Sequence, residues 1–143
     1  MKTLTTLIKL QKSRVDEQRQ HVARLQLMLD AIMQKITELE IEKAREQVAA
    51  ENNPGARSTY GAFLQATAAK GRELEMARKA AAHAIDQALA KLTELFEEQK
   101  RYEIAESARI EAEAKEERRR ERIDLDEIGG VMYERRKGAR EEE

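Results

Sequence analysis

The sequence contains no cysteine and no tryptophan, and it has one proline and few aromatic side chains. Without cysteine the chain can form no disulfide framework and offers no thiolate for catalysis or metal binding. With only Phe63, Phe96 and three tyrosines as aromatic residues, it also lacks the large side chains that a thick globular core needs. Charged residues make up 38% of the chain, and much of the remainder is alanine and leucine, a composition typical of long helices and coiled coils.

The chain also lacks an excess of charge of one sign, because its formal net charge is −1. A protein with a general attraction to nucleic acid or anionic lipid would carry a strongly basic balance, so any electrostatic recognition must be local. No run of about 18 apolar residues occurs, and the N-terminus has no secretion signal. We therefore expect no nucleic-acid partner and no direct membrane insertion.

Two stretches of sequence repeat apolar residues with alternating steps of four and three. We call the positions reached by these steps the seam, and in each stretch nine of the thirteen seam positions are apolar. The first seam comprises Leu4, Ile8, Gln11, Val15, Gln18, Val22, Leu25, Leu29, Ile32, Ile36, Leu39, Lys43 and Glu46. The second comprises Tyr60, Leu64, Thr67, Gly71, Leu74, Arg78, Ala81, Ile85, Ala88, Leu92, Leu95, Gln99 and Tyr102. A repeat of 3.5 residues keeps an apolar stripe facing a partner helix, so each stretch predicts one strand of a coiled coil.

The single proline lies between the two stretches, in Asn52-Asn53-Pro54-Gly55, where every residue favours a turn. Two helices with matching seams and a short connection fold back on one another most simply. The sequence therefore predicts an all-α fold, a long antiparallel two-helix coiled-coil hairpin over residues 1–128. The first helix should span about 3–50, the turn about 51–57 with Ser58 as the cap, and the second helix about 58–128. A turn near Pro54 would place Leu25 near His83.

The second helix is longer than the first, so its distal part forms a C-terminal helical overhang without a partner. It carries four arginines among acidic residues, followed by Leu125 and Ile128 on one face. Docking of another protein, a plain solvated helix and contact with nucleic acid phosphates are the alternatives for this cluster. The Gly129-Gly130 pair should end or bend the helix, leaving 129–143 as a flexible charged tail whose end, from Glu134 to Glu143, should be disordered.

No nucleotide-binding glycine loop occurs, and a two-helix rod offers no water-excluding site for a catalytic triad. We therefore expect that the chain is not an enzyme, and we predict no catalytic residues, no cofactor and no metal.

Three features of the sequence resemble the flagellar export protein FliJ family. The first is an amphipathic start, from Leu4 to Glu17, and the second is Tyr60-x-x-Phe63-Leu64 just after the turn. The third is Lys100-Arg101-Tyr102-Glu103 followed, after a charged run, by Asp124-Leu125-Asp126-Glu127-Ile128. The Gly129-Gly130 pair departs from the family pattern, in which many relatives continue as helix.

The resemblance implies a cytoplasmic stalk in the flagellar type III export apparatus, peripherally associated with the inner membrane and monomeric when free. Such a stalk would bind the hexameric export ATPase FliI, promote assembly of its ring, and couple it to the export gate FlhA and to export chaperones. Carried over to this chain, the implied ATPase contacts are Arg118, Arg119, Arg120, Arg122, Asp126 and Ile128. Tyr60 and Phe63 correspond to a region linked to the export gate, although the same residues could simply close the hairpin.

Two other functions fit the same sequence. One is a general coiled-coil adaptor or scaffold, which a self-dimer of rods would favour. The other is the equivalent stalk of an injectisome-type secretion system.

Overall fold

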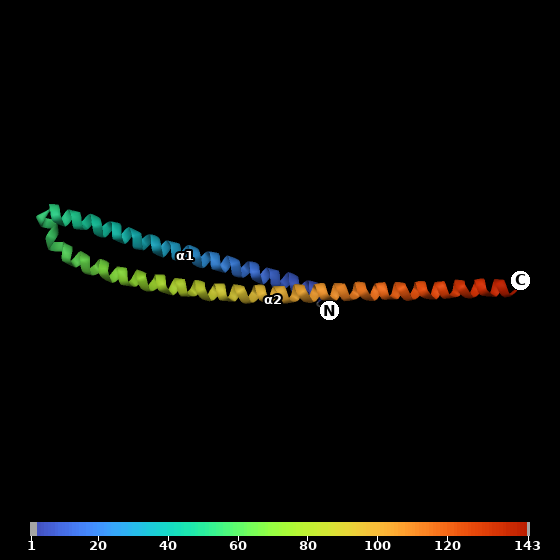
Figure 1. Cartoon of the computed structure of the whole chain (residues 1–143). Helices are drawn as coiled ribbons and strands as arrows, with labels where there is room; N and C mark the ends of the chain where they lie inside the picture. Colours follow the sequence, from blue (N-terminus) through green and yellow to red (C-terminus); the bar gives the residue numbers. More distant parts are fainter. Residues whose placement is uncertain (1–2, 143) are drawn as a thin grey trace. The chain divides into compact units, whose positions relative to one another are not determined.

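The computed structural model describes residues 3–142 and consists of two helices, α1 (Leu4–Asn52) and α2 (Pro54–Glu142), drawn in Figure 1. No strand occurs within these residues, which confirms the all-α fold class. Contacts within the chain define two units, one comprising Leu10–Glu98 and the other Met1–Lys9 with Gln99–Glu143.

The Leu10–Glu98 unit is an antiparallel helical hairpin. The side-chain amide of Gln11 donates a hydrogen bond to the carbonyl of Leu95 (3.0 Å), and that of Gln18 donates one to the carbonyl of Ala88 (2.9 Å). A step of seven residues forward in α1 is thus matched by seven residues backward in α2. Figure 1 shows these two stretches side by side. The predicted hairpin is confirmed for this unit.

The predicted seam is the buried stripe of both helices. Seam positions of α1 are buried or half-buried up to Lys43, and Val15 is only 2% exposed. Every seam position of α2 is likewise covered except Leu64, which is 39% exposed. The register set by the glutamine contacts places Leu25 opposite Ala81, close to the predicted neighbour His83. Coiled-coil periodicity therefore identified the packed face.

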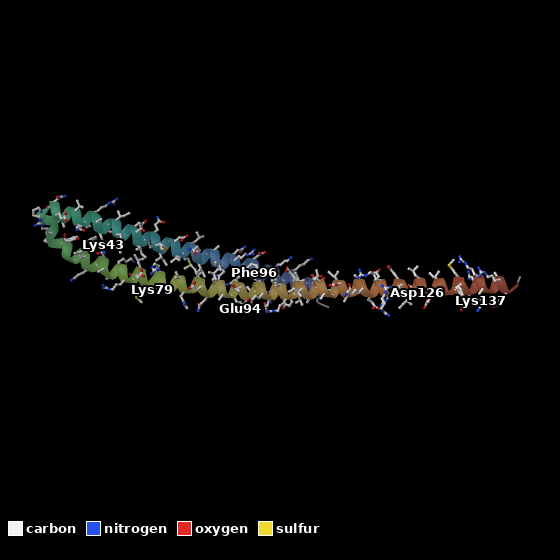
Figure 2. The ribbon with its side chains drawn as sticks, viewed as in Figure 1. Lys43, Lys79, Glu94, Phe96, Asp126 and Lys137 are labelled. Atoms are coloured by element: carbon white, nitrogen blue, oxygen red, sulfur yellow. The ribbon has the colours of Figure 1, made fainter. Side chains whose placement is uncertain are left out.

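Arg19 of α1 makes a cation–π contact with Phe96 of α2. The guanidinium carbon of Arg19 in α1 lies 4.8 Å from the ring centroid of Phe96, which is labelled in Figure 2. This distance suits a cation–π contact between the two helices, and it shields a ring that remains 37% exposed. This cation–π contact adds to the apolar packing of the seam.

The connection between the helices is tighter than the sequence predicts. Asn53 alone separates α1 from α2, and its side-chain oxygen accepts a hydrogen bond from the backbone amide of Gly55 (3.0 Å). Pro54 occupies the first helical position, where its missing amide hydrogen is not needed. The cap is therefore Asn53, and the prediction of Ser58 as the cap is wrong. The Ser58 hydroxyl instead donates to the Gly55 carbonyl within α2 (3.1 Å).

The end of α1 is capped from α2. The Arg57 guanidinium donates to the carbonyls of Ala50 (3.1 Å) and Glu51 (3.5 Å), which lie in the last turn of α1. A cation at a helix C-terminus satisfies orphan carbonyls and complements the negative end of the helix dipole. The predicted loop over about 51–57 thus shortens to Asn53, because side chains on both sides cap the helix ends.

The second unit is built mostly from α2. The Thr5 hydroxyl of α1 donates to Oε1 of Glu106 (3.3 Å), and Arg109 bonds both Glu106 (2.7 Å) and Glu113 (2.8 Å). From residue 107 to residue 141 every residue of α2 is exposed except Glu116. We call residues 107–142 the α2 extension.

The α2 extension differs from the predicted helix end at residue 128. The helix continues through Gly129 and Gly130 to Glu142, and neither glycine adopts a positive φ. Glycine costs about 1 kcal/mol relative to alanine in a helix, but unlike proline it blocks no hydrogen bond. Flexibility of the 129–143 segment stays a prediction. Neither helix has, within the residues described, a stretch long and apolar enough to cross a membrane.

Candidate functional site

The four arginines predicted as a contact cluster divide into two kinds in the structure. Arg119 and Arg120 both reach back to Glu116, the half-buried carboxylate of the α2 extension. Arg119 forms a forked pair with it, with Nε to Oε2 at 3.0 Å and Nη2 to Oε1 at 2.7 Å. Arg120 adds a longer contact of 3.5 Å. The charges of these two arginines are therefore partly compensated within their own helix.

The pairing with Glu116 changes the acid–base properties of the cluster. The hydrogen bond from Arg119 lowers the pKa of the Glu116 carboxyl, and its positive charge acts in the same direction. The same bond raises the pKa of the Arg119 guanidinium. Both groups therefore remain charged across the physiological pH range.

Arg118 and Arg122 form a different face of the helix. Among residues 3–142 neither has a carboxylate within 4.0 Å. Their spacing of four residues places them one above the other, and Leu125 follows Arg122 after three more residues on the same side. Two arginines that form no ion pair within 4.0 Å thus border an apolar side chain, with Glu121 three residues after Arg118 on the same side.

The apolar members of this face are open to solvent. Leu125 is 68% exposed and Ile128, three residues further along, is 57% exposed. Asp126 lies four residues after Arg122 and borders the face on that side. Asp126, labelled in Figure 2, lies in the part of the α2 extension where every residue from 117 to 141 is exposed. We call Arg118, Arg122, Leu125 and Ile128 the docking face.

The docking face has the chemistry of a protein-binding surface. Burial of exposed leucine and isoleucine by a partner would stabilise the complex. Arginines at their edge can form two parallel hydrogen bonds with a carboxylate. Arginine beside apolar side chains is also the combination enriched in binding hot spots. The structure thus brings together Arg118, Arg122 and Ile128 of the predicted set, places Asp126 at their edge, and separates Arg119 and Arg120 from them.

Sequence reasoning missed the role of Glu116. Its position three residues before Arg119 and four before Arg120 is the spacing at which helical side chains meet. That spacing was the available signal. The described residues contain no group of three or more potential metal ligands placed to hold an ion.

Tyr60 and Phe63 lie in the hairpin unit, on the first turns of α2. Their ring centroids are 6.2 Å apart and their planes are inclined by 21°, so the rings stack on each other. Both side chains are half-buried. Both residues belong to α2, so the stack is a contact within one helix, and contact of the two rings with an export gate stays a prediction.

Comparison with known proteins agrees with the family resemblance of the motifs. No curated protein and no solved structure gives a significant match to the chain. The family model described as flagellar FliJ protein matches residues 1–138, which is nearly the whole sequence. The chain therefore belongs to the FliJ family, which supplies a component of the flagellar protein export apparatus.

Proposed function

We propose that this chain is the cytoplasmic, non-enzymatic stalk of the flagellar export apparatus, which binds the export ATPase ring and promotes its assembly. Its docking face would contact the ATPase FliI, and the bound stalk would couple ATP hydrolysis to the export gate FlhA and to export chaperones. Family membership supports the setting in flagellar export. The observation that carries the proposal is the docking face itself, which the fold leaves uncovered.

The uncovered side chains argue for a binding role because they add nothing to the packing of the hairpin. Leu125 and Ile128 are 68% and 57% exposed in a part of α2 where every residue from 117 to 141 is exposed. Single exposed apolar residues are ordinary, but two on one face beside two arginines that form no ion pair within 4.0 Å make a compact surface for a partner. A ring of subunits could hold such a helix through carboxylates and a few apolar contacts.

The gate contact would use another part of the chain. Tyr60 and Phe63 present the remaining area of a stacked aromatic pair near the turn. Aromatic side chains supply large contact area at little entropic cost, which suits a contact with the gate. Peripheral association with the inner membrane would follow from these protein contacts.

The proposal is tested with purified flagellar export ATPase from the same organism. We expect its rate of ATP hydrolysis to rise and saturate as this protein is added, with ring formation visible by electron microscopy. No change in rate together with no co-elution would contradict the proposal.

A matched pair of variants makes the test specific for the docking face. Leu125→Asp should abolish the stimulation, whereas Leu27→Asp should not, although Leu27 in α1 is equally exposed (69% against 68%). Equal losses in both variants would show that the docking face is not the contact.

A further inference from the structure

The seam of the hairpin is interrupted just before the turn. From Leu10 to Lys43 no more than three consecutive residues of α1 are exposed, as expected for a helix with one buried stripe. All six residues from 44 to 49 are exposed, although they include the seam position Glu46. Burial resumes at Ala50, which is 6% exposed. The last seam layer of α1 is therefore not packed.

The register of the hairpin shows which residues lie opposite this interruption. The contacts of the two seam glutamines match seven residues forward in α1 with seven residues backward in α2. Continued toward the turn, this register places Glu46 opposite Tyr60, and it places Lys43, which is labelled in Figure 2, in the same layer as Leu64. Two charged positions of α1 thus face an aromatic and an apolar position of α2.

The two charged side chains account for the interruption. A lysine or a glutamate would lose its hydration on entering the seam, which costs free energy unless a partner compensates the charge. Lys43 instead pairs with Glu40 of its own helix, with Nζ 3.7 Å from Oε1. In the same layer Leu64 is 39% exposed, unlike the other seam positions of α2. The apolar side of α2 therefore lacks an apolar partner at this point.

The contacts that hold the turn are local to it. The Arg57 guanidinium donates to the Ala50 carbonyl (3.1 Å), and the rings of Tyr60 and Phe63 stack on each other. Both contacts join residues that lie between 44 and 66. In the Leu10–Glu98 unit, the hydrogen bonds between the helices that lie outside the turn start from the two seam glutamines, at the far end of the hairpin. Polar contacts therefore do not tie the turn and its flanking segments to the rest of the hairpin.

We propose that residues 44–66 open locally as one unit while the rest of the seam stays packed. Helices in proteins are stabilised mainly by packing, so helical turns with few buried apolar side chains open at a lower free energy than the rest. Lys43 and Glu46 set the boundary of this unit, because their charges prevent closure of the seam. The opening is a property of the chain alone and goes beyond the proposed function. Its link to the gate contact of Tyr60 and Phe63 rests on that function.

The first test is amide hydrogen exchange of the full chain without any partner, followed by mass spectrometry. We expect the amides of residues 44–66 to exchange about tenfold or more faster than those of residues 74–95. The slower segment carries Leu74, Ile85 and Leu95, which are at most 8% exposed. Equal exchange in the two segments would overturn the proposal. Because no ATPase or gate protein is present, this proposal and the proposed function can fail separately.

The second test closes the interrupted seam. Lys43→Leu with Glu46→Leu places two apolar side chains opposite the apolar side of α2. Exchange of residues 44–66 should then slow about tenfold, and the melting temperature should rise by about 5 °C or more. Lys35→Leu with Glu38→Leu is the matched control, because it makes the same substitutions at the same spacing on exposed positions of α1, and it should change neither quantity. No slowing in the first variant, or equal slowing in both, would overturn the proposal.

Discussion

The hairpin unit and the α2 extension contain the same types of apolar residue but differ in how far these side chains are buried. Val15, Leu74 and Leu95 in the hairpin are at most 8% exposed, whereas Leu125, Ile128 and Val131 in the extension are at least 50% exposed. Burial of an apolar side chain in the hairpin stabilises the fold, whereas the same side chain in the extension is exposed and adds no such stabilisation. Substitutions in the hairpin should therefore alter stability, and substitutions in the extension should alter binding.

The largest effect should follow from placing a charge in the hairpin seam. Val15→Asp buries a carboxylate without a partner at a site that is 2% exposed, and should lower the free energy of unfolding by about 3 kcal/mol or more. Val48→Asp is the matched control, because Val48 lies in the same helix but is 55% exposed. Thermal melts followed by circular dichroism measure both. Equal melting temperatures for the two variants would show that the seam is misplaced.

A smaller loss should follow from removing the buried polar contact of the seam. Gln11, 1% exposed, donates to the Leu95 carbonyl (3.0 Å) and to the Glu98 carboxylate (2.9 Å). Gln11→Ala removes both bonds and leaves a cavity, so it should cost about 2 kcal/mol. Gln26→Ala removes only an exposed bond to Asp30 and should cost much less. Urea unfolding compares them, and a similar midpoint for both variants would contradict this account.

A gain in stability should follow from filling the narrowest seam position. A Cβ built on Gly71 would lie 3.8 Å from Cδ2 of Leu39, an ordinary packing distance. Gly71→Ala should therefore stabilise the hairpin by about 1 kcal/mol through helix propensity, with a small further gain from this contact. Gly61→Ala has nothing within 4 Å and should gain the propensity alone. Destabilisation by Gly71→Ala in the same urea assay would mean that the helices approach more closely than described.

The smallest effect concerns the ion pair of the extension. The hydrogen bond from Arg119 lowers the pKa of Glu116 in the folded chain, so its contribution to stability is present at neutral pH and is lost as the pH falls through that lowered pKa. Because the pair is exposed, the change in melting temperature should be slight. Carboxyl NMR titration should give Glu116 a pKa below 4.5, rising in Arg119→Ala. An unchanged pKa of Glu116 in that variant would show that Arg119 does not pair with Glu116.

The two regions also differ in how far the sequence predicts them. Periodicity identified the seam from Leu4 to Lys43, because burial in a coiled coil follows a fixed spacing. The roles of Gln11 and Gln18 were missed because they depend on carbonyls in the other helix. Their positions seven residues apart within an apolar seam were the only hint.

The helix ends and the arginine cluster were predicted less well. Asn53 rather than Ser58 caps α2, because the whole Asn52–Gly55 cluster favours turns and composition alone does not choose the capping residue. At Gly129 and Gly130 the sequence lowers helix propensity without forbidding the helix, so residue type alone does not decide whether the helix continues to Glu142. The division of four neighbouring arginines depends on which of them turns toward Glu116.

We propose that the docking face, and not arginine content in general, binds the export ATPase. The most direct test of this claim is the affinity of two double variants for purified FliI, measured by titration calorimetry. Arg118→Ala with Arg122→Ala should weaken binding about tenfold or more, whereas Arg119→Ala with Arg120→Ala, which removes the same charge, should change it little. Equal weakening by both pairs, or no weakening by the first, would contradict the claim.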